Sequence, residues 1–389
     1  MDDKKACSVQ RETEEAESLI SSQDPKKMEP ERSWSDLQPE ILSLILSNLF
    51  FWDSSNFSAT CQSWKSICPP FPPPNESLLS KLPYLMTLNG SKCTFFQPLR
   101  NEMYQKEIPE LKNARIRFSK YGWLLMSQGE SSVFFFHPCT MVKIKLPDLP
   151  TRNWFDNMCF LNRPTSSDCT VIGISRYSAG MEFCIIKRGA EEWTYENLEN
   201  NLPFSMSAAS PVSHNGKLYC LGEGGNVGEL DLSGDEWMYW DVLIKPLYRW
   251  PCSKYRQSFM VKCDDGNGML VVYVTREDRR VHVKKLKLLE MLWEDVECLG
   301  DKMIFVSHGA SFLQDAVEKG MANKIYFPKF RGKSGVFYSL DTGMFHSIVG
   351  DYPCRSSFNM ADQLSCTWIN DIECSSSCML STVEEWSRI

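Results

Sequence analysis

The sequence predicts a mainly β protein in which a small all-α module precedes an irregular β-propeller of six or seven blades. Between residues 34 and 67, apolar residues recur at three- and four-residue steps, the period of amphipathic helices. From about 84 to 370, short aromatic and β-branched runs alternate with Gly, Asn, Asp and Pro, as strands alternate with turns. A weak repeat in this second region favours stacked four-stranded units over one unusually long two-sheet sandwich.

Composition excludes several classes of protein. The chain of 389 residues is 43% hydrophobic and 23% charged, with a net charge of −7. A nucleic-acid-binding protein would show a basic domain, and none is visible. The longest apolar run, 41–52, contains Ser43, Ser47 and Asn48 and is much shorter than the roughly 20 residues of a membrane span. We therefore expect binding to neither nucleic acid nor membrane.

The cysteines and histidines show no pattern of metal ligands. The 16 cysteines are scattered singly and the five histidines are dispersed, whereas metal sites need closely spaced ligand pairs. We expect no metal and no cofactor. The first residues are charged and lack the apolar stretch of a signal peptide. These features predict a reduced protein of the nucleus and/or cytoplasm without a native disulfide.

The helical module is predicted at 32–68, after an acidic leader at 1–31 that we expect to be disordered. Pro39 and Glu40 suit the first turn of a helix, where proline loses no hydrogen bond and an acid favours the helix dipole. The apolar stripe of this helix follows at helical spacing: Ile41, Leu42, Ile45, Leu46 and Leu49.

Two more short helices are expected in the module. Asp53 and Ser54 are good N-caps for the second helix. The apolar residues of the third recur at steps of four and three: Phe57, Cys61, Trp64 and Ile67. A unit of about 35 residues rarely folds stably without help. The module is therefore expected either to cap the larger domain or to dock on a partner.

A proline-rich stretch at 69–80 is predicted to be a stiff linker, and the propeller is predicted at 81–370. The clearest strands of the propeller are short runs of apolar residues bounded by turn residues. They are Tyr84–Leu88, Trp123–Met126, Val133–Phe136, Phe183–Lys187, Lys217–Leu221, Leu270–Thr275, Val281–Leu289, Met303–Ser307 and Lys324–Phe327. One short turn of helix is expected within 314–320.

The repeat consists of a strand, a polar turn, a second strand and an aromatic closing residue. The closing residues, separated by 44, 56 and 52 residues, are Trp193, Trp237, Trp293 and Phe345. A four-stranded blade repeats about every 40–50 residues, so these spacings suit a propeller. We expect the closing residues to pack between blades rather than to hold a ligand.

No catalytic motif is complete. Gly222–Gly228 lacks the G-x-G-x-x-G spacing and a following helix, which favours a hairpin turn. Gly332–Ser334 lacks the glycine that a phosphate-binding loop needs at 327, and Gly173–Tyr177 lacks the last glycine of a nucleophile elbow. The acids of the repeat are expected in turns: Asp231, Asp235 and Asp341. We therefore expect no catalytic residue.

The order of residues in the module resembles the plant F-box. The matching residues are Trp34-x-x-Leu37-x-Pro39-Glu40-Ile41-Leu42, Ile45-Leu46-x-x-Leu49 and Ala59-x-Cys61-x-Ser63-Trp64. The sequence departs from the family where Gln38 separates Leu37 from Pro39, where Asn56 replaces an arginine and where Thr60 replaces a valine.

This resemblance implies that the module binds the Skp adaptor of a cullin–RING ubiquitin ligase. The residues expected to contact the adaptor are Leu37, Pro39, Ile41, Ile45, Leu46 and Trp64. The residues expected to hold the module together are Leu42, Leu49 and Cys61.

The β region resembles the kelch-like, KIB-type propeller that follows F-boxes in plants, a domain of unknown function. The matching residues are Pro83–Met86, Phe95-Phe96, Tyr121–Leu124, His137-Pro138, Ile144–Pro147, Leu299–Asp301, Ile325–Phe327, Val336–Asp341 and Cys366–Trp368. Residues 371–389 lack the proline ending expected for the family and are predicted to be a mobile tail.

The resemblance implies a substrate-recognition adaptor of an SCF-type ubiquitin ligase. Its propeller would present loops on one face to an unknown substrate protein. Such an adaptor makes no bonds itself and acts by raising the local concentration of substrate. An alternative is an interaction scaffold without ligase function, since Gln38 and Thr60 depart from the F-box. A propeller enzyme is a third hypothesis, which a cluster of acids or histidines on one face of the blades would favour.

Overall fold

The computed structural model describes residues 33–49, 51–68, 82–98, 101–150, 155–232, 238–244, 255–263, 266, 268–275, 280–331, 334–348, 365–370 and 386. The chain divides into two compact units, one of residues 1–49 and 54–68 and the other of residues 50–53 and 69–389. The predicted leader at 1–31, the linker at 69–80 and all of the tail except Trp386 lie outside the described residues. Their boundaries stay predictions.

Four short helical segments come before the propeller in the chain. They are η1 (Trp34–Asp36), α1 (Pro39–Asn48), α2 (Phe51–Thr60) and α3 (Gln62–Ile67). The start of α1 at Pro39 confirms the prediction from the sequence. Gln38 is the N-cap residue of α1, and its side chain makes no capping bond, so the helix begins with proline and Glu40 alone as favourable residues.

The other two helices differ from the sequence prediction. Asp53 lies inside the first turn of α2 rather than before it, a position in which its charge still favours the helix dipole. The backbone is extended at Cys61, which becomes the N-cap of α3. This break places Phe57 in α2 and Trp64 in α3, so the predicted stripe belongs to two helices that face each other.

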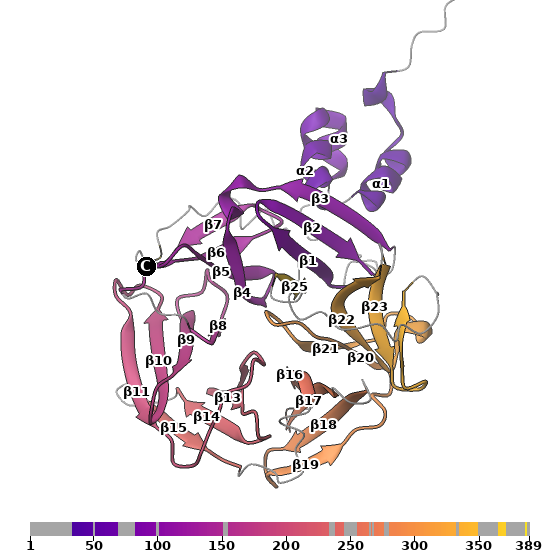
Figure 1. Cartoon of the computed structure of the whole chain (residues 1–389). Coiled ribbons are helices and arrows are strands. Elements are labelled where there is room, and N and C mark those ends of the chain that lie inside the picture. Colours follow the sequence, from indigo (N-terminus) through magenta and orange to yellow (C-terminus); the bar gives the residue numbers. More distant parts are fainter. Residues whose placement is uncertain are drawn as a thin grey trace, which may run out of the picture. The chain divides into compact units, whose positions relative to one another are not determined.

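The second unit is a ring of six sheets, which confirms the predicted propeller and fixes the number of blades at six (Figure 1). Blade 1 contains β25 (Cys366–Ile369), β1 (Tyr84–Asn89), β2 (Lys92–Gln97) and β3 (Glu102–Glu107); blade 2 contains β4 (Ala114–Lys120), β5 (Trp123–Gln128), β6 (Ser132–His137) and β7 (Val142–Lys145); blade 3 contains β8 (Asn157–Phe160), β9 (Thr170–Arg176), β10 (Gly180–Lys187) and β11 (Thr194–Glu199).

The remaining blades follow in chain order. Blade 4 contains β12 (Val212–His214), β13 (Lys217–Leu221), β14 (Val227–Asp231) and β15 (Tyr239–Val242); blade 5 contains β16 (Tyr255–Lys262), β17 (Gly268–Thr275), β18 (Val281–Lys287) and β19 (Leu292–Asp295); blade 6 contains β20 (Lys302–Phe305), β21 (Phe312–Asp315), β22 (Lys324–Arg331), β23 (Ser334–Ser339) and β24 (Met344–Ser347). Two 3-10 turns, η3 (Pro109–Leu111) and η4 (Lys319–Met321), connect strands. Of the helical turn expected within 314–320, only its end falls in η4.

The ring closes through pairing of distant segments. Strand β25 pairs antiparallel with β1, so Trp368 lies opposite Leu85, and the two strands lie side by side in Figure 1. This pairing places the last described strand and the first strand in one blade and leaves no open end between blades 1 and 6. Blade 6 is unusual because β20 pairs parallel with β22 and antiparallel with β21. A parallel pair needs a crossover connection, which β21 and η4 provide.

Blades are joined by a recurring hydrogen bond from a tryptophan. In four places an indole N–H donates to an oxygen atom of the preceding blade around the ring: Trp193 to the Pro147 carbonyl (2.8 Å), Trp240 to Asn200 Oδ1 (2.9 Å), Trp293 to the Gly225 carbonyl (2.9 Å) and Trp368 to the Val306 carbonyl (3.1 Å). These bonds satisfy the polar atom of each large ring at a buried interface. The closing residues Trp193 and Trp293 therefore pack between blades, as predicted.

The fourth blade uses a different tryptophan from the predicted one. Trp237 lies outside the described residues, and Trp240 in β15 makes the bond to blade 3. The ring of Trp240 lies directly on Gly228 of β14, where a Cβ atom would come 2.0 Å from the indole. Glycine is therefore required at 228 for this tryptophan to pack.

The prediction of a mobile tail at 371–389 is wrong at Trp386. Its side chain is 1% exposed and belongs to the same core cluster as blades 2 and 3. The ring lies 5.5 Å from that of Phe135, and the Arg188 guanidinium lies 5.7 Å from it. Its carbonyl accepts a hydrogen bond from the Gly189 N–H at 3.2 Å. A large ring that removes this much apolar surface from water is held in place.

The expectation of no disulfide is wrong at Cys139, which is disulfide-bonded. Ten other described cysteines are free. A disulfide requires two Cβ atoms within about 4.5 Å of each other. Spacing along the chain does not reveal that proximity, because the fold creates it.

Candidate functional site

The helical unit leaves several large apolar side chains exposed. Trp34 is 74% exposed, Leu44 65% and Ile41 43%. Of the six residues predicted to contact an adaptor, Pro39 and Ile41 are exposed, and the other four are half-buried: Leu37, Ile45, Leu46 and Trp64. The start of α1 therefore presents apolar groups to solvent at the place that the sequence indicated.

A few aromatic contacts hold this unit together. Leu42 is fully buried, in keeping with its predicted structural role, and Phe57 is 3% exposed. The rings of Phe57 and Trp64 lie 4.5 Å apart, and the Trp64 indole N–H donates to the Trp34 carbonyl at 3.0 Å. Trp64 thus connects α3 to α2 and to η1. The sequence reasoning missed Phe57 as a core residue and gave Trp64 only a contact role.

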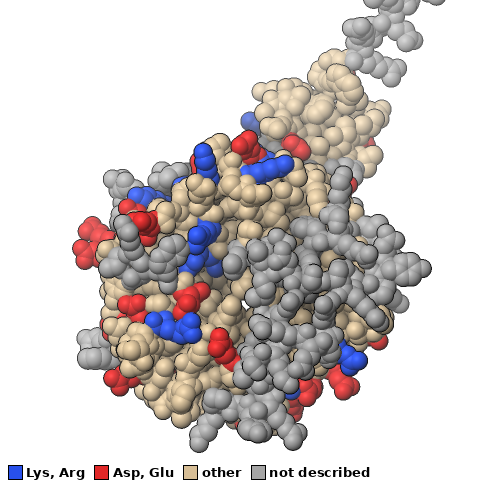
Figure 2. All heavy atoms as spheres, viewed as in Figure 1, with Lys and Arg blue, Asp and Glu red and all other residues tan. Residues whose placement is uncertain are grey.

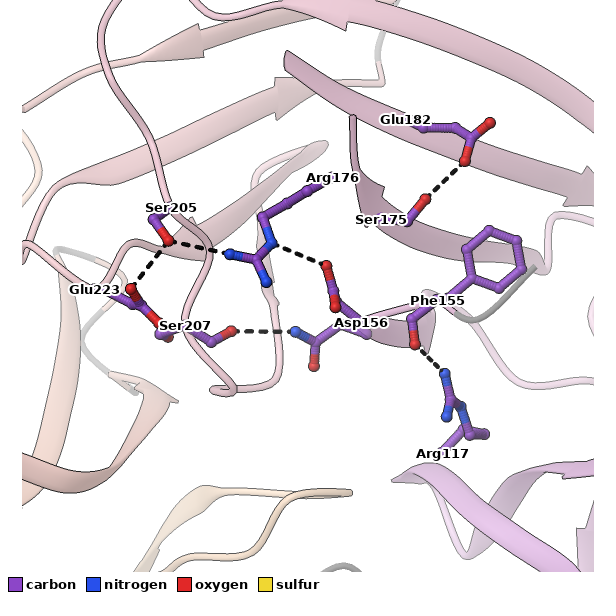
Figure 3. A network of polar contacts seen from close by, with 10 residues as sticks. Arg117, Phe155, Asp156, Ser175, Arg176, Glu182, Ser205, Ser207 and Glu223 are labelled. Carbon is purple, nitrogen blue, oxygen red and sulfur yellow. Dashed lines mark hydrogen bonds and ion pairs between the residues drawn. The ribbon is translucent and has the colours of Figure 1, made fainter. Parts of the chain in front are cut away.

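One face of the propeller carries a network of polar groups between blades 3 and 4 (Figure 3). Arg176, at the end of β9, donates to Asp156 at 3.3 Å and to Ser205 at 3.2 Å. The Ser205 hydroxyl donates in turn to Glu223 at 3.0 Å. The Asn157 amide also reaches across to the Ser207 carbonyl at 3.3 Å. These residues come from loops and strand ends, where propellers offer groups for recognition.

A half-buried arginine lies beside this network. Arg117 on β4 donates to the Phe155 carbonyl at 2.5 Å (Figure 3). Burial lowers its pKa, the neighbouring Arg115 lowers it further, and Asp156 acts in the opposite direction. Because guanidinium groups stay charged in proteins, Arg117 is a fixed positive charge that holds the segment leading into β8.

At the other end of β8, the chain lines an axial cavity of about 580 Å³. Asn157 begins β8 and belongs to the polar network, whereas Cys159 and Phe160 near its end line the cavity. The network and the cavity therefore lie toward opposite ends of the innermost strands. The sequence reasoning did not find either site, because their residues come from segments that are far apart along the chain.

The sequence motifs considered for catalysis take structural positions. Gly222 to Asn226 form the turn between β13 and β14, as the sequence predicted, and Gly173 lies inside β9. Asp231 ends β14 within 3.7 Å of the Lys217 ammonium group, and the Asp341 carboxylate accepts from Asn323 at 2.6 Å. Asp235 and the pair 332–333 lie outside the described residues.

Several thiols that could act as nucleophiles are instead inert. Burial raises the pKa of Cys93, Cys159, Cys169 and Cys184 to about 12. A reactive cysteine needs a lowered pKa and access to solvent. In the part of the chain that the structure describes, no group of three or more His, Cys, Asp or Glu side chains could hold a metal ion.

Charges are mixed over the visible surface of the propeller. Figure 2 shows basic and acidic side chains interspersed, without one large field of a single sign on the described residues of this face. No described helix is long and apolar enough to cross a membrane. The fold therefore defines a protein with a six-bladed propeller that follows a helical unit with an exposed apolar face.

Comparisons with known proteins identify both parts. Residues 95–346 match the KIB1-4 beta-propeller and residues 34–71 match the F-box domain. The F-box/kelch-repeat protein At1g57790 of Arabidopsis thaliana is 33% identical, with 80% of this chain and 88% of the relative covered. The F-box proteins At4g00893 and At3g56470 of the same plant are 27% and 26% identical, with 84% and 80% of this chain and 84% and 83% of each relative covered.

The chain therefore belongs to the family of plant F-box proteins with a KIB1-4 beta-propeller. The two resemblances noted in the sequence are confirmed. All three relatives are named as F-box proteins, and At1g57790 is named as an F-box/kelch-repeat protein.

Proposed function

We propose that this protein is the substrate-recognition adaptor of an SCF-type cullin–RING ubiquitin ligase. In this role the F-box binds a Skp-type adaptor and the propeller binds a substrate protein, while the chain itself makes no bonds. The observation that carries the proposal is the exposed apolar face at the start of α1, with Trp34, Ile41 and Leu44 open to solvent. A unit with so few buried residues gains most from covering that face with a partner.

The exposure of the six residues bears on which of them we propose as adaptor contacts. Pro39 and Ile41 are exposed, and Leu37, Ile45 and Leu46 are half-buried, so all five are accessible to a partner. Trp64 instead has its ring on Phe57 and its N–H bonded to Trp34. Replacing Trp64 would disturb the fold of the unit, so it is a poor test of the interface.

The double variant Leu37→Ala with Pro39→Ala tests the proposal by co-purification with a Skp-type adaptor. Interface anchors each contribute about 2 kcal/mol or more, so the double variant should weaken adaptor binding far more than tenfold. The matched control is Leu289→Ala, which removes a 95% exposed leucine from the propeller and should bind like the wild type. Wild-type binding by the double variant would show that the adaptor docks elsewhere.

The alternative, an interaction scaffold without ligase function, makes the opposite prediction for the wild-type chain. It rests on Gln38 and Thr60, which depart from the F-box pattern. Failure of the unmutated protein to recover any Skp-type adaptor would favour the scaffold over the ligase subunit.

Residence in the nucleus and/or cytoplasm is part of the same proposal, since that is where cullin–RING ligases act. Disulfides are rare in those compartments, so the bonded Cys139 provides a sharp test. A fluorescent fusion should accumulate in nucleus or cytoplasm; accumulation in an oxidising compartment would contradict the ligase proposal.

A further inference from the structure

The axial cavity is built by all six blades. It has a volume of about 580 Å³ and is lined by the ends of the innermost strands and the turns that follow them, which surround the centre of the ring in Figure 1. Among the lining residues are Lys120 of blade 2, Phe160 of blade 3, His214 of blade 4, Lys262 of blade 5 and Phe312 of blade 6, with Asn370 following β25 of blade 1. Cavities of about 300–1,000 Å³ accommodate small organic molecules.

Among the described residues, the charged groups that line this cavity are positive. Lys120 and Lys262 line it, and no carboxylate does so among the described residues, although the whole chain has a net charge of −7. Asp264, Asp265 and Asp371 lie outside the described residues. Clefts lined by one sign of charge concentrate ligands of the opposite sign.

The ammonium group of Lys120 is held in place by neutral partners. It donates to the Leu161 carbonyl at 3.0 Å and lies 3.4 Å from the Ser213 hydroxyl. It also lies 4.8 Å from the centre of the Tyr121 ring. Because these partners orient the charge without neutralising it, Lys120 presents a positive charge at the cavity wall.

Two buried polar atoms on the cavity wall have no hydrogen-bond partner. Ser119 is 4% exposed and His214 is 7% exposed, and both line the cavity. The Oγ of Ser119 and the Nδ1 of His214 make no hydrogen bond. The backbone N–H of Ser119 is bonded to the Gly309 carbonyl at 2.7 Å, so the main chain is satisfied while the hydroxyl is not. Buried polar atoms without partners destabilise a fold, and a bound ligand would supply the missing partners.

The rest of the wall is apolar. The described apolar residues that line it include Phe118, Phe160, Val212, Leu218, Met260 and Leu313. A site that combines an apolar wall with a few polar and positive groups fits a molecule with an apolar body and a negative head.

We propose that the axial cavity binds a small organic anion, a carboxylate or a phosphate monoester attached to an apolar body. Lys120 and Lys262 attract the negative head, and Ser119 and His214 complete its hydrogen bonds. This inference goes beyond the proposed ligase function and stands independently of it, because every residue that carries it lies in the propeller.

Titration of the full-length chain by calorimetry tests the proposal with four probes that share a phenyl ring. Phenyl phosphate and benzoate are anionic, benzyl alcohol is neutral and benzylamine is cationic. At least one of the anionic probes should bind more tightly than the neutral and cationic probes, and the stronger of the two identifies phosphate or carboxylate as the preferred head. Equal binding of all four, preference for benzylamine, or no binding of either anion would overturn the proposal.

Two variants test whether the anion binds in this cavity. Lys262→Met removes an exposed charge at the end of β16 and should weaken binding of the preferred anion at least about tenfold, as loss of a charged hydrogen bond predicts. The matched control is Lys187→Met, which removes an exposed lysine at the end of β10, away from the cavity lining, and should bind like the wild type. Equal effects of the two changes would show that net charge alone attracts the anion.

Ser119→Ala separates a ligand-binding role from a structural one. Removing an unpaired buried hydroxyl should leave the melting temperature unchanged or raise it, while it weakens binding of the preferred anion by several-fold. A lower melting temperature with unchanged binding would mean that the hydroxyl serves the fold and would contradict its assignment to the ligand.

Discussion

Among the described residues of the helical unit, two apolar side chains are buried, those of Leu42 and Phe57. The large side chains of Trp34, Ile41 and Leu44 are exposed. The propeller buries its apolar residues in large clusters shared by neighbouring blades. It also pairs the indole N–H groups of four tryptophans, which donate hydrogen bonds across blade interfaces. The propeller therefore buries most of its large apolar side chains without a partner, whereas the helical unit leaves some of them exposed to solvent.

This difference indicates where each unit obtains its stability. Burial of apolar surface stabilises a fold by about 25 cal/mol per Å², and the propeller has buried most of its apolar groups within itself. The exposed apolar surface of the helical unit can still contribute this free energy when a partner covers it. Substitutions of large apolar residues should accordingly affect stability in the propeller and binding in the helical unit.

The largest expected effect on stability comes from Trp386→Ala. Trp386 is 1% exposed and packs on Phe135, and truncation of a buried tryptophan typically costs about 3–5 kcal/mol. Denaturant unfolding of the full-length chain measures the change in the free energy of unfolding of the propeller. Trp34→Ala, at a 74% exposed tryptophan of the helical unit, should change it by less than about 0.5 kcal/mol. Equal losses in the two variants would refute the comparison.

Mild acid should destabilise the propeller through its histidines, because all five lie beyond residue 136. Burial, together with a smaller contribution from the nearby Arg163 charge, lowers the pKa of His137 from 6.5 to about 4. Its Nδ1 accepts the Thr140 backbone N–H at 3.2 Å, a bond that protonation would destroy. The unfolded chain therefore binds a proton that the folded chain excludes between pH 6.5 and 4.

The stability contributed by neutral His137 is fully present above pH 6.5 and is lost as the pH falls toward 4, by about 3 kcal/mol in all. Unfolding free energies measured across this range should fall with pH in the wild type and fall less steeply in His137→Asn. A variant with an unchanged slope would show that another group causes the acid sensitivity.

A smaller effect should come from the hydrogen bonds between blades. Trp193→Phe leaves the Pro147 carbonyl without its donor, whereas Trp386→Phe removes an indole N–H that has no partner. Both changes shrink a buried ring, so the first should cost about 1–3 kcal/mol more than the second. Thermal or denaturant unfolding of both variants gives the difference, and equal costs would mean that the indole bonds do not stabilise the ring.

The smallest effect is expected in the helical unit. The double variant Ile41→Ser with Leu44→Ser changes two exposed residues and should alter the unfolding free energy of the propeller by less than about 0.5 kcal/mol. The same unfolding assay applies. A loss comparable with that of Trp386→Ala would show that these leucine and isoleucine side chains support the fold rather than a partner.

The sequence by itself determined the local structure where neighbouring residues carry the information. Pro39 and Glu40 placed the start of α1, and the glycines at 222–228 placed the turn between β13 and β14. The strands recognised in advance are mostly those in the middle of blades, such as β6 and β17, whose residues are buried nearly throughout. Outer strands such as β11 alternate weakly and expose charged residues, so their pattern resembles that of a loop.

Only the tertiary structure decided which distant segments meet. The pairing of β25 with β1 closes the ring, the parallel pair of β20 and β22 depends on a crossover, and Trp386 is buried against Phe135, which is distant in the sequence. The axial cavity is the clearest case, because Ser119 and Lys120 come from blade 2, His214 from blade 4 and Lys262 from blade 5. Periodicity reports on residues within a few positions of one another, whereas these contacts depend on how the whole chain winds around one axis.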